Sequence, residues 1–300
     1  MSGTIQSLER RIDGAADLEG VVRAMKALAA SSIGQYERAV ASLNDYYRTV
    51  ELGLSVCLRQ AGAAKDAGSG GPIGAVVFGS DQGLVGRFNE VVVDLATATL
   101  KSHPGNIRKL WAVGERVNAL LTDTGAAPVD QFSVPVSVDA ITPLVGRLLV
   151  AIESAREKGE VVNVHVFHNR PKSGALYEPV HVRLLPLDSV WQGRVAKIPW
   201  PGRSTSEKPQ PEVIGESAAT LKGFIRGYLF MLLFQACAES LNSENASRLA
   251  AMQRAEKNIK DILEDLTLKF HRARQESIDE ELFDVVSGFE ALAKRKRLKR

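Results

Sequence analysis

A proline-free stretch from Ile214 to Leu292 constrains the fold more than any other feature of this chain. It predicts one helix of about 80 residues, which at ~1.5 Å of rise per residue would be more than about 110 Å long. No single globular core needs such a helix. Its apolar residues recur at intervals of three, four and seven, as in a helix that packs along another helix. They are Leu249, Met252, Ile259, Leu263, Leu266, Phe270 and Ala273.

The N-terminal segment supplies a matching helix. It is also free of proline, and its apolar residues keep the same spacing. They are Ile5, Leu8, Ile12, Val22, Met25, Ala29, Tyr36, Leu43, Tyr47, Val50 and Leu54. Two long complementary helices at the two ends of a chain predict an antiparallel coiled coil, because the region between them must return the chain. Such a molecule is suited to transmitting force or position along an axis.

The middle of the chain has a different pattern, in which short apolar runs alternate with amphipathic segments. The predicted strands are Ile73–Phe78, Leu110–Val113, Val161–Phe167 and Val180–Leu187, and the predicted helices are Asn89–Leu100, Glu115–Leu121 and Ala140–Arg156. Alternating strands and helices predict a doubly wound, Rossmann-like α/β sheet with helices on both faces. The last two strands are separated by a turn around Lys172-Ser173-Gly174 and should add an antiparallel edge.

The sequence therefore predicts five parts. These are a long helix over 1–60, an α/β domain over 73–190, a loop over 191–211, a second long helix over 212–293 and a basic tail over 294–300. A Gly-, Ala- and Ser-rich segment from Ala61 to Pro72 predicts a flexible exit from the first helix. Four prolines and several Gly and Ser residues indicate that 191–211 is a loop.

Composition excludes several classes of protein. Six of the 38 Lys and Arg residues lie within the last seven positions, so the rest of the chain is slightly acidic despite a net charge of +3. A duplex-binding fold normally carries a basic face, so nucleic acid is not the expected partner. The longest apolar run, Gly227–Cys237, is about half the length that a bilayer crossing needs. No secretory signal precedes it, so we expect a cytoplasmic protein whose Cys57 and Cys237 are reduced and partly buried.

The block Gly79–Gly86 follows a predicted strand and precedes a predicted helix, where a phosphate-binding loop would lie. Its spacing matches neither G-x-G-x-x-G nor G-x-x-x-x-G-K-[ST], and no lysine follows to meet a phosphate. We interpret it as a tight turn with structural glycines.

The five histidines lack the spacing of metal ligands; they are His103, His165, His168, His181 and His271. His165 and His168 are three apart on a strand and should face opposite sides. No G-x-S-x-G elbow presents a nucleophile. The sequence predicts no catalytic site, metal or cofactor.

Three groups of residues, in this order, resemble the gamma subunit of F-type ATP synthases. The first is Arg10-Arg11-Ile12 followed by Ala24-Met25-Lys26, and the second is Ser80-Asp81-Gln82-Gly83-Leu84-Val85-Gly86 with Asn89. The third combines Ser243–Met252, Arg274–Ile278, Glu281-Leu282 and Val285–Gly288. One block alone would be weak, but the ordered set spans almost the whole chain.

This resemblance implies a central rotor shaft. The terminal helices would turn inside a ring of alpha and beta subunits, and the α/β domain would sit below them with the epsilon subunit and the membrane c-ring. Catalysis would belong to the beta subunits. The chain would be one non-catalytic copy in a hetero-oligomer, peripheral to the cytoplasmic side of the membrane, and would couple ion flow to ATP synthesis or hydrolysis. The choice of transported ion would belong to the membrane ring.

The resemblance also implies partner contacts at five residues. Arg274 and Gln275 match a pair that hydrogen-bonds to a loop of the beta subunit in the family, and Glu281 lies in the following block. Met25 and Lys26 match the block where the first helix crosses the second. Without the resemblance, Arg274 and Gln275 are interpreted as a solvated helix face and Met25 as seam packing.

The chain departs from the family at its C-terminal end. Ile278-Asp279-Glu280-Glu281 replaces the usual Ile-Thr-x-Glu, Gly288-Phe289 replaces Gly-Ala, and the basic tail extends past the usual end. These departures suggest a divergent branch of the family. The tail is either a solvated helix end or a contact for acidic groups of partners. Two other functions stay open: a Rossmann-like nucleotide-binding enzyme with helical arms, and a coiled-coil scaffold that binds nucleic acid through its tail.

Overall fold

A computed structural model of the chain describes residues 2–61, 70–103, 107–173, 175–201 and 211–298. The chain divides into two compact units. One consists of Met1–Leu28 with Leu249–Arg300, and the other of Ala29–Arg248. Two helices contribute to both units: α1, Ser2–Ala61, and α6, Ser217–Leu298. The α/β fold with long terminal helices that pack together is therefore confirmed, and each unit is described in turn.

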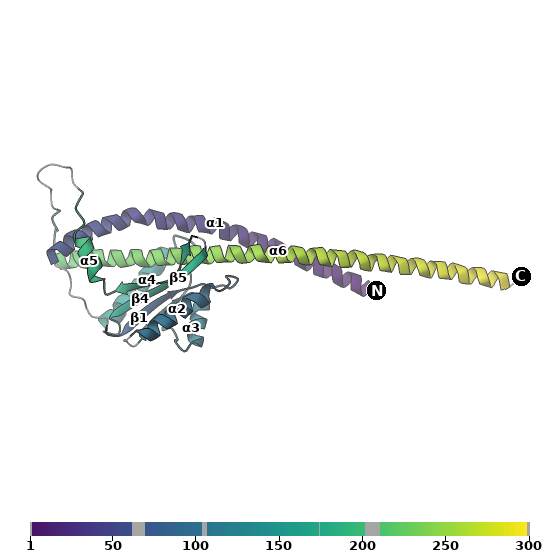
Figure 1. Ribbon diagram of the computed structural model, residues 1–300, viewed down its shortest axis with the longest axis horizontal. Coiled ribbons are helices and arrows are strands. Elements are labelled where there is room, and N and C mark those ends of the chain that lie inside the picture. The colour runs from purple at the N-terminus through teal and green to yellow at the C-terminus, as the bar shows by residue number, and fades with distance from the viewer. Residues whose placement is uncertain (1, 62–69, 104–106, 174, 202–210, 299–300) are drawn as a thin grey trace. The chain divides into compact units, whose positions relative to one another are not determined.

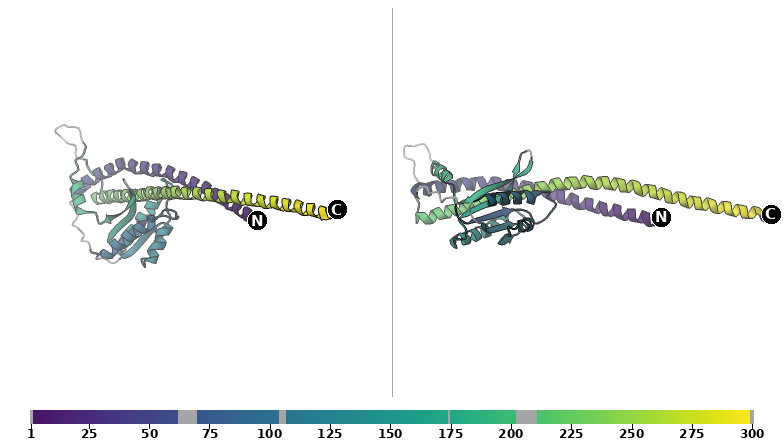
Figure 2. Two further views of the ribbon diagram at one scale, coloured as in Figure 1. Left: turned by 45° about the vertical axis from the view of Figure 1, so that its right-hand side comes forward. Right: turned by 60° about the horizontal axis from the view of Figure 1, so that its bottom comes forward.

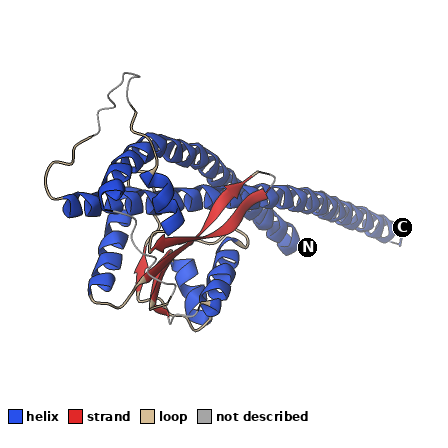
Figure 3. Cartoon of the chain, turned by 60° about the vertical axis from the view of Figure 1, so that its left-hand side comes forward, coloured by secondary structure: helices blue, strands red, loops and turns tan. Residues whose placement is uncertain are grey.

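The larger unit is built on a five-stranded sheet with the order β3-β2-β1-β4-β5. Its strands, shown in red in Figure 3, are β1 (Ile73–Phe78), β2 (Ile107–Val113), β3 (Asp130–Phe132), β4 (Asn163–Lys172) and β5 (Ala175–Leu185). The first four strands pair in parallel and β5 pairs antiparallel with β4. The predicted doubly wound sheet with an antiparallel edge is confirmed.

Helices cover both faces of this sheet because its central strands are apolar on both sides. Strand β1 is buried at all six positions. On one face, α2 (Phe88–Ser102) and α3 (Glu115–Asp123) share a core with Ala75 and Val77. On the other, α4 (Ile141–Glu157) shares a core with Val76, Phe78 and the α1 and α6 segments of this unit. The long helices are therefore part of the α/β core and do not merely project from it.

The α1 and α6 segments of this unit run side by side and antiparallel (Figures 1 and 2). Near the end of α1, the Phe224 ring occupies the space that a Cβ on Gly53 would take. Earlier in α1, the rings of Tyr47 and Tyr228 have centroids 6.1 Å apart. Residue numbers rise along one helix as they fall along the other, as predicted from the two matching apolar patterns.

The smaller unit consists of the first 28 residues of the chain and the α6 segment from Leu249 onward. The predicted apolar positions are buried or half-buried in both segments. Within the α6 segment of this unit, Met252 and Leu266 are the buried apolar residues, at 2% and 4% exposure. The interval of three, four and seven residues therefore identified the packed face of each helix correctly.

The boundaries of α6 differ from the prediction of Ile214–Leu292. The helix begins at Ser217 because Gly215 just before it has a φ of +95°, outside the helical region. It continues to Leu298 since no glycine or proline stops it after Gly288. Lys299 and Arg300, the end of the predicted tail, lie outside the described residues.

The prediction that 191–211 is entirely loop is wrong at its start. Helix α5 spans Ser189–Ala196, and the side chain of Asp188 accepts hydrogen bonds from the backbone N–H groups of Val190 and Trp191 at its N-terminus. Trp191 and Val195, one turn apart, are buried in the core. Most of the predicted flexible exit, residues 62–69, lies outside the described residues, as do 202–210.

Helix α6 is long and apolar enough, by length and composition alone, to be a candidate for crossing a membrane, and 44% of its most apolar window is buried. A core helix passes the same test. The apolar run Gly227–Cys237 supplies Leu229, Met231 and Leu233 to the α/β core, which accounts for its hydropathy. Cys57 and Cys237 are both free thiols and both buried.

Candidate functional site

The loop after β1 is a tightly packed turn. A Cβ on Gly79 would lie 2.5 Å from Val117, and one on Gly114 would lie 2.8–2.9 Å from the backbone of Ser80. These approaches leave no room for side chains, so glycine is required at both positions. The interpretation of Gly79–Gly86 as a turn with structural glycines is consistent with this packing.

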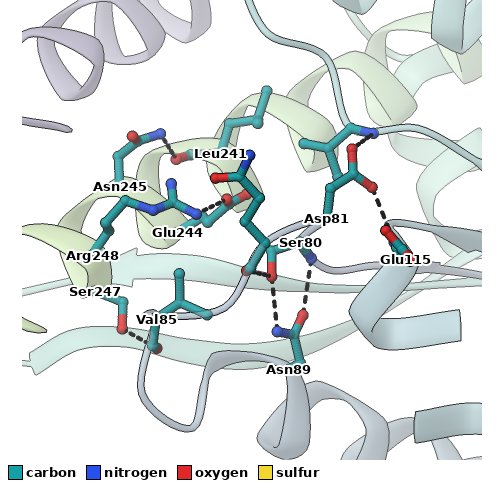
Figure 4. A network of polar contacts seen from close by, with 12 residues as sticks. Ser80, Asp81, Val85, Asn89, Glu115, Leu241, Glu244, Asn245, Ser247 and Arg248 are labelled. Carbon is teal, nitrogen blue, oxygen red and sulfur yellow. Dashed lines mark hydrogen bonds and ion pairs between the residues drawn. The ribbon is translucent and has the colours of Figure 1, made fainter. Parts of the chain in front are cut away.

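Two polar side chains hold this turn in place (Figure 4). The side chain of Asn89 accepts a hydrogen bond from Ser80 N at 2.9 Å and donates one to Ser80 Oγ at 2.8 Å. Asp81 accepts hydrogen bonds from Glu115 N at 3.0 Å and Val134 N at 2.9 Å. The turn therefore ties the ends of β1, α2 and α3 together.

The same turn is anchored to α6. Ser247 Oγ donates a hydrogen bond of 2.5 Å to the backbone carbonyl of Val85. One turn earlier, Glu244 Oε1 accepts a hydrogen bond from Arg248 Nη2 at 2.6 Å (Figure 4). Burial raises the pKa of the Glu244 carboxyl, and the charge of Arg248 opposes that shift. The Ser247–Val85 hydrogen bond joins α6 to the turn that Ser80, Asp81 and Asn89 hold in place, and this junction is called the anchor below.

A second polar contact joins the sheet to α6 on the same face. Glu239 Oε2 accepts from His168 Nε2 at 2.8 Å and from Arg170 Nε at 3.2 Å, and Glu239 Oε1 accepts from Gln235 at 2.7 Å. Burial alone would raise the pKa of Glu239, but the hydrogen bonds from His168 and Gln235 hold it below its ordinary value.

Sequence reasoning missed this contact, since β4 and α6 are about 70 residues apart and only the fold brings them together. The available signal was the alternation of β4, which correctly placed His165 and His168 on opposite faces. His168 contacts Glu239 on α6, whereas His165 contacts His181 on the neighbouring edge strand β5.

In the smaller unit, Lys26 is paired within the chain. Its ammonium group lies 2.6 Å from Glu256 Oε2. This hydrogen bond lowers the pKa of the Glu256 carboxyl. Met25, the neighbouring residue, is half-buried. Of the five residues assigned to partner contacts, these two thus lie at the α1–α6 seam.

The other three, Arg274, Gln275 and Glu281, are exposed on α6. The same end of α6 carries exposed apolar residues. They are Ile278 (54% exposed), Leu282 (63%), Phe283 (70%), Val285 (59%) and Val286 (48%). An exposed set of large apolar side chains beside polar ones is typical of a protein–protein contact surface.

Within the part of the chain that the structure describes, no group of three or more His, Cys, Asp or Glu side chains is arranged to hold a metal ion. Asp81 accepts hydrogen bonds from backbone N–H groups, Glu244 pairs with Arg248, and Gly79 and Gly114 pack against Val117 and the backbone of Ser80. The geometry is that of a mechanical joint.

Comparison with known proteins gives the family. A family model described as ATP synthase matches residues 4–292. The ATP synthase gamma chain of Sorangium cellulosum is 26% identical over 96% of this chain and 99% of its own length. That of Frankia casuarinae is 27% identical over 98% of this chain and 99% of its own.

Solved structures show the same fold. A rotor chain of the Euglena gracilis mitochondrial ATP synthase aligns over 93% of this chain and 100% of its own length, with a TM-score of 0.59 and 13% identity. A chain from the Tetrahymena thermophila central stalk and c-ring structure aligns over 78% of this chain and 99% of its own, with a TM-score of 0.56 and 19% identity. The resemblance drawn from the sequence blocks is confirmed: the chain belongs to the ATP synthase family, and the named relatives that it resembles there are gamma chains.

Proposed function

We propose that this chain is the central rotor shaft of an F-type ATP synthase and couples ion flow through a membrane ring to ATP synthesis or hydrolysis in partner subunits. The observation that carries the proposal is the continuity of α6. One part of this 82-residue helix is built into the α/β core, and the other pairs with the start of α1 and exposes an apolar end. A torque applied to the α/β unit therefore reaches the paired helices through an unbroken backbone.

The partners follow from the two ends of the shaft. The paired helices turn inside the ring of alpha and beta subunits, and the α/β unit binds the epsilon subunit and the membrane c-ring. As the shaft turns, each beta subunit meets a different face of it. Differences in contact free energy between faces bias each catalytic site toward a tight, loose or open state.

The partner surface on α6 consists of Arg274, Gln275 and Glu281 together with the exposed apolar end. Arg274 offers a rigid fork of donors to a carboxylate or carbonyl group on the beta subunit. Lys26 binds Glu256 with one of its three N–H groups, which leaves the others for a partner, and Met25 packs beside it. In this proposal, the intrachain pair holds Lys26 at a fixed position on the shaft.

Catalysis lies outside this chain. The turn at Gly79–Gly86 is tightly packed at Gly79 and lacks the lysine of a phosphate loop, which supports a non-catalytic role. The complex is peripheral to the membrane on its cytoplasmic side, and one copy of this chain serves each complex.

Affinity purification of the tagged full-length chain from its source tests the proposal. Alpha, beta and c-ring subunits should accompany it, and the isolated chain should hydrolyse no ATP after stringent removal of contaminating ATPase. Recovery without any ATPase subunit would contradict the proposal. In that case, equilibrium dialysis with ATP and NAD would test the Rossmann-like enzyme, and salt-sensitive DNA binding lost on deleting residues 294–300 would favour the scaffold.

A further inference from the structure

Three histidines from three elements converge in the α/β unit. His165 lies on β4, His181 lies on the edge strand β5, and His103 is the capping residue that follows α2. The ring centroid of His165 is 4.8 Å from that of His103 and 4.9 Å from that of His181. The Phe167 ring stacks on the His181 ring, with the two centroids 4.9 Å apart. This histidine cluster joins the sheet edge to the end of a helix.

The closest contact in the cluster constrains its protonation. His165 Nδ1 lies 2.6 Å from His181 Nε2. One nitrogen must donate a hydrogen and the other must accept it, so at least one ring is neutral. A full positive charge on both rings would set one N–H against the other and break this side-chain hydrogen bond, which adds to the backbone pairing of β4 with β5.

The surroundings of the cluster oppose a positive charge. His165 is 1% exposed. The groups that act on it are His181 and Arg183 from β5 and His103 from the end of α2, all of them basic, while β1 contributes Ala75 as its strand partner. Burial first, and then these neighbours, lower the pKa of His165 to about 4. Burial and His103 also lower the pKa of His181.

Two ring nitrogens of the cluster, His103 Nδ1 and His165 Nε2, are buried without a hydrogen-bond partner among the described residues. A proton added there would be a buried, unpaired donor, which is costly.

We propose that His103, His165 and His181 form an acid-sensitive latch, which holds β5 and the end of α2 against β4 at neutral pH and releases them on acidification. The neutral rings pack and share a hydrogen bond. The charged rings repel one another and Arg183. This inference concerns the α/β unit itself and does not depend on the proposed function.

The direction of the pH dependence follows from the lowered pKa of His165. Its stabilising contribution is complete above the ordinary value of 6.5 and is lost as the pH falls toward about 4. By linkage, His165 alone makes the closed state about 30-fold less favoured at pH 5 than at pH 7.5. Glu244 acts in the opposite direction, because burial raises its pKa and protonation relieves it. A comparison of variants is therefore needed to separate the pH dependence of the histidine cluster from that of Glu244.

Hydrogen exchange of the full-length chain at pH 7.5 and pH 5.0, corrected for the intrinsic rates, tests the latch. In the wild type, exchange over β4 and β5 should be at least about tenfold faster at the lower pH. The double variant His165→Leu/His181→Phe removes both partners of the hydrogen bond and leaves neither orphaned, so its change should stay below about threefold. His271→Gln, on the exposed surface of α6, is the matched control and should behave as the wild type.

Equal acid sensitivity in the double variant and the wild type would overturn the proposal, as would wild-type exchange that does not change with pH. If the double variant does not fold, a second measurement on the wild type still tests the latch. NMR titration of the His165 ring should give a midpoint well below 6.5. A midpoint at 6.5 would mean that the folded state does not lower the pKa of His165, and the latch would be excluded.

Discussion

At the scale of single residues, neighbours decide how a buried carboxylate behaves. Glu239 and Glu244 lie five positions apart on α6 and are both buried. Glu239 accepts hydrogen bonds from three side chains, and its pKa is lowered overall. Among the described residues, Glu244 accepts a side-chain hydrogen bond from Arg248 alone, and its pKa is raised. Buried charges need several donors to stay ionised at low cost. Neither environment is visible in the sequence, where both are glutamates on a helix.

Asn89→Ala should destabilise the α/β unit by about 3 kcal/mol. The change removes both side-chain hydrogen bonds to Ser80 and leaves its buried N–H without this acceptor, while the Ser80 hydroxyl keeps its hydrogen bond to Gln82 O. Urea unfolding monitored by circular dichroism measures the loss. Asn44→Ala, at an exposed position of α1, is the control and should change stability little. An equal effect of the two variants would show that the anchor contributes no stability.

Lys26→Met should raise the pKa of Glu256 toward its ordinary value, because the hydrogen bond that lowers it is lost. The pair stabilises the fold above the ordinary carboxyl pKa, and this contribution disappears as the pH falls through the lowered pKa in the folded state. Carboxyl NMR titration measures the shift. Lys257→Met removes an exposed lysine next to Glu256 in sequence and should leave the Glu256 titration unchanged. If Glu256 in Lys26→Met titrated with the wild-type midpoint, the pairing of Lys26 with Glu256 would be refuted.

At the scale of elements, the sequence predicted what depends on periodic burial. The seam of α1 and α6 and all four predicted strands were found, because each is long or fully apolar. Strand β3 was missed, since it has three residues and little burial. Helix α5 was missed because the prolines that follow it led to the prediction of a loop over 191–211. Asp188 was a usable N-cap signal for this helix.

Two glycines of α1 make a matched pair that tests the helix packing. Gly53→Ala should destabilise the chain by about 1–3 kcal/mol, since the new methyl group must displace the Phe224 ring on α6. Gly34→Ala meets nothing within 4 Å and should stabilise α1 by up to about 1 kcal/mol through helix propensity. Thermal unfolding of both variants gives the comparison. If Gly53→Ala were as favourable as Gly34→Ala, the close approach of α1 and α6 would be wrong.

At the scale of the whole molecule, the chain order of helix, α/β domain and helix followed from the sequence, and the ordered blocks identified the family. The contacts between distant segments did not follow, because they depend on how the sheet registers against α6. Ser247 with Val85 and His168 with Glu239 are examples. The partner residues Arg274, Gln275 and Glu281 stay predictions, since a surface side chain acquires its role only in the assembled complex.

Arg274→Ala should leave the chain folded, because an exposed helix-face charge contributes little to stability. It should nevertheless slow coupled ATP turnover in the assembled complex, since the beta subunit loses a donor. Arg272→Ala, an exposed arginine two positions away, controls for loss of charge alone and should turn over as the wild type does. Normal turnover with normal assembly of Arg274→Ala would assign the residue to solvated surface.

Direct observation of rotation tests the central claim. Because Cys57 and Cys237 are buried, an Asp123→Cys variant offers an exposed thiol at the end of α3 for a probe. With the alpha and beta ring fixed to a surface and ATP supplied, the probe should turn continuously in one direction. A probe that stays fixed relative to the ring while the same complexes hydrolyse ATP would contradict the assignment of this chain as the rotor.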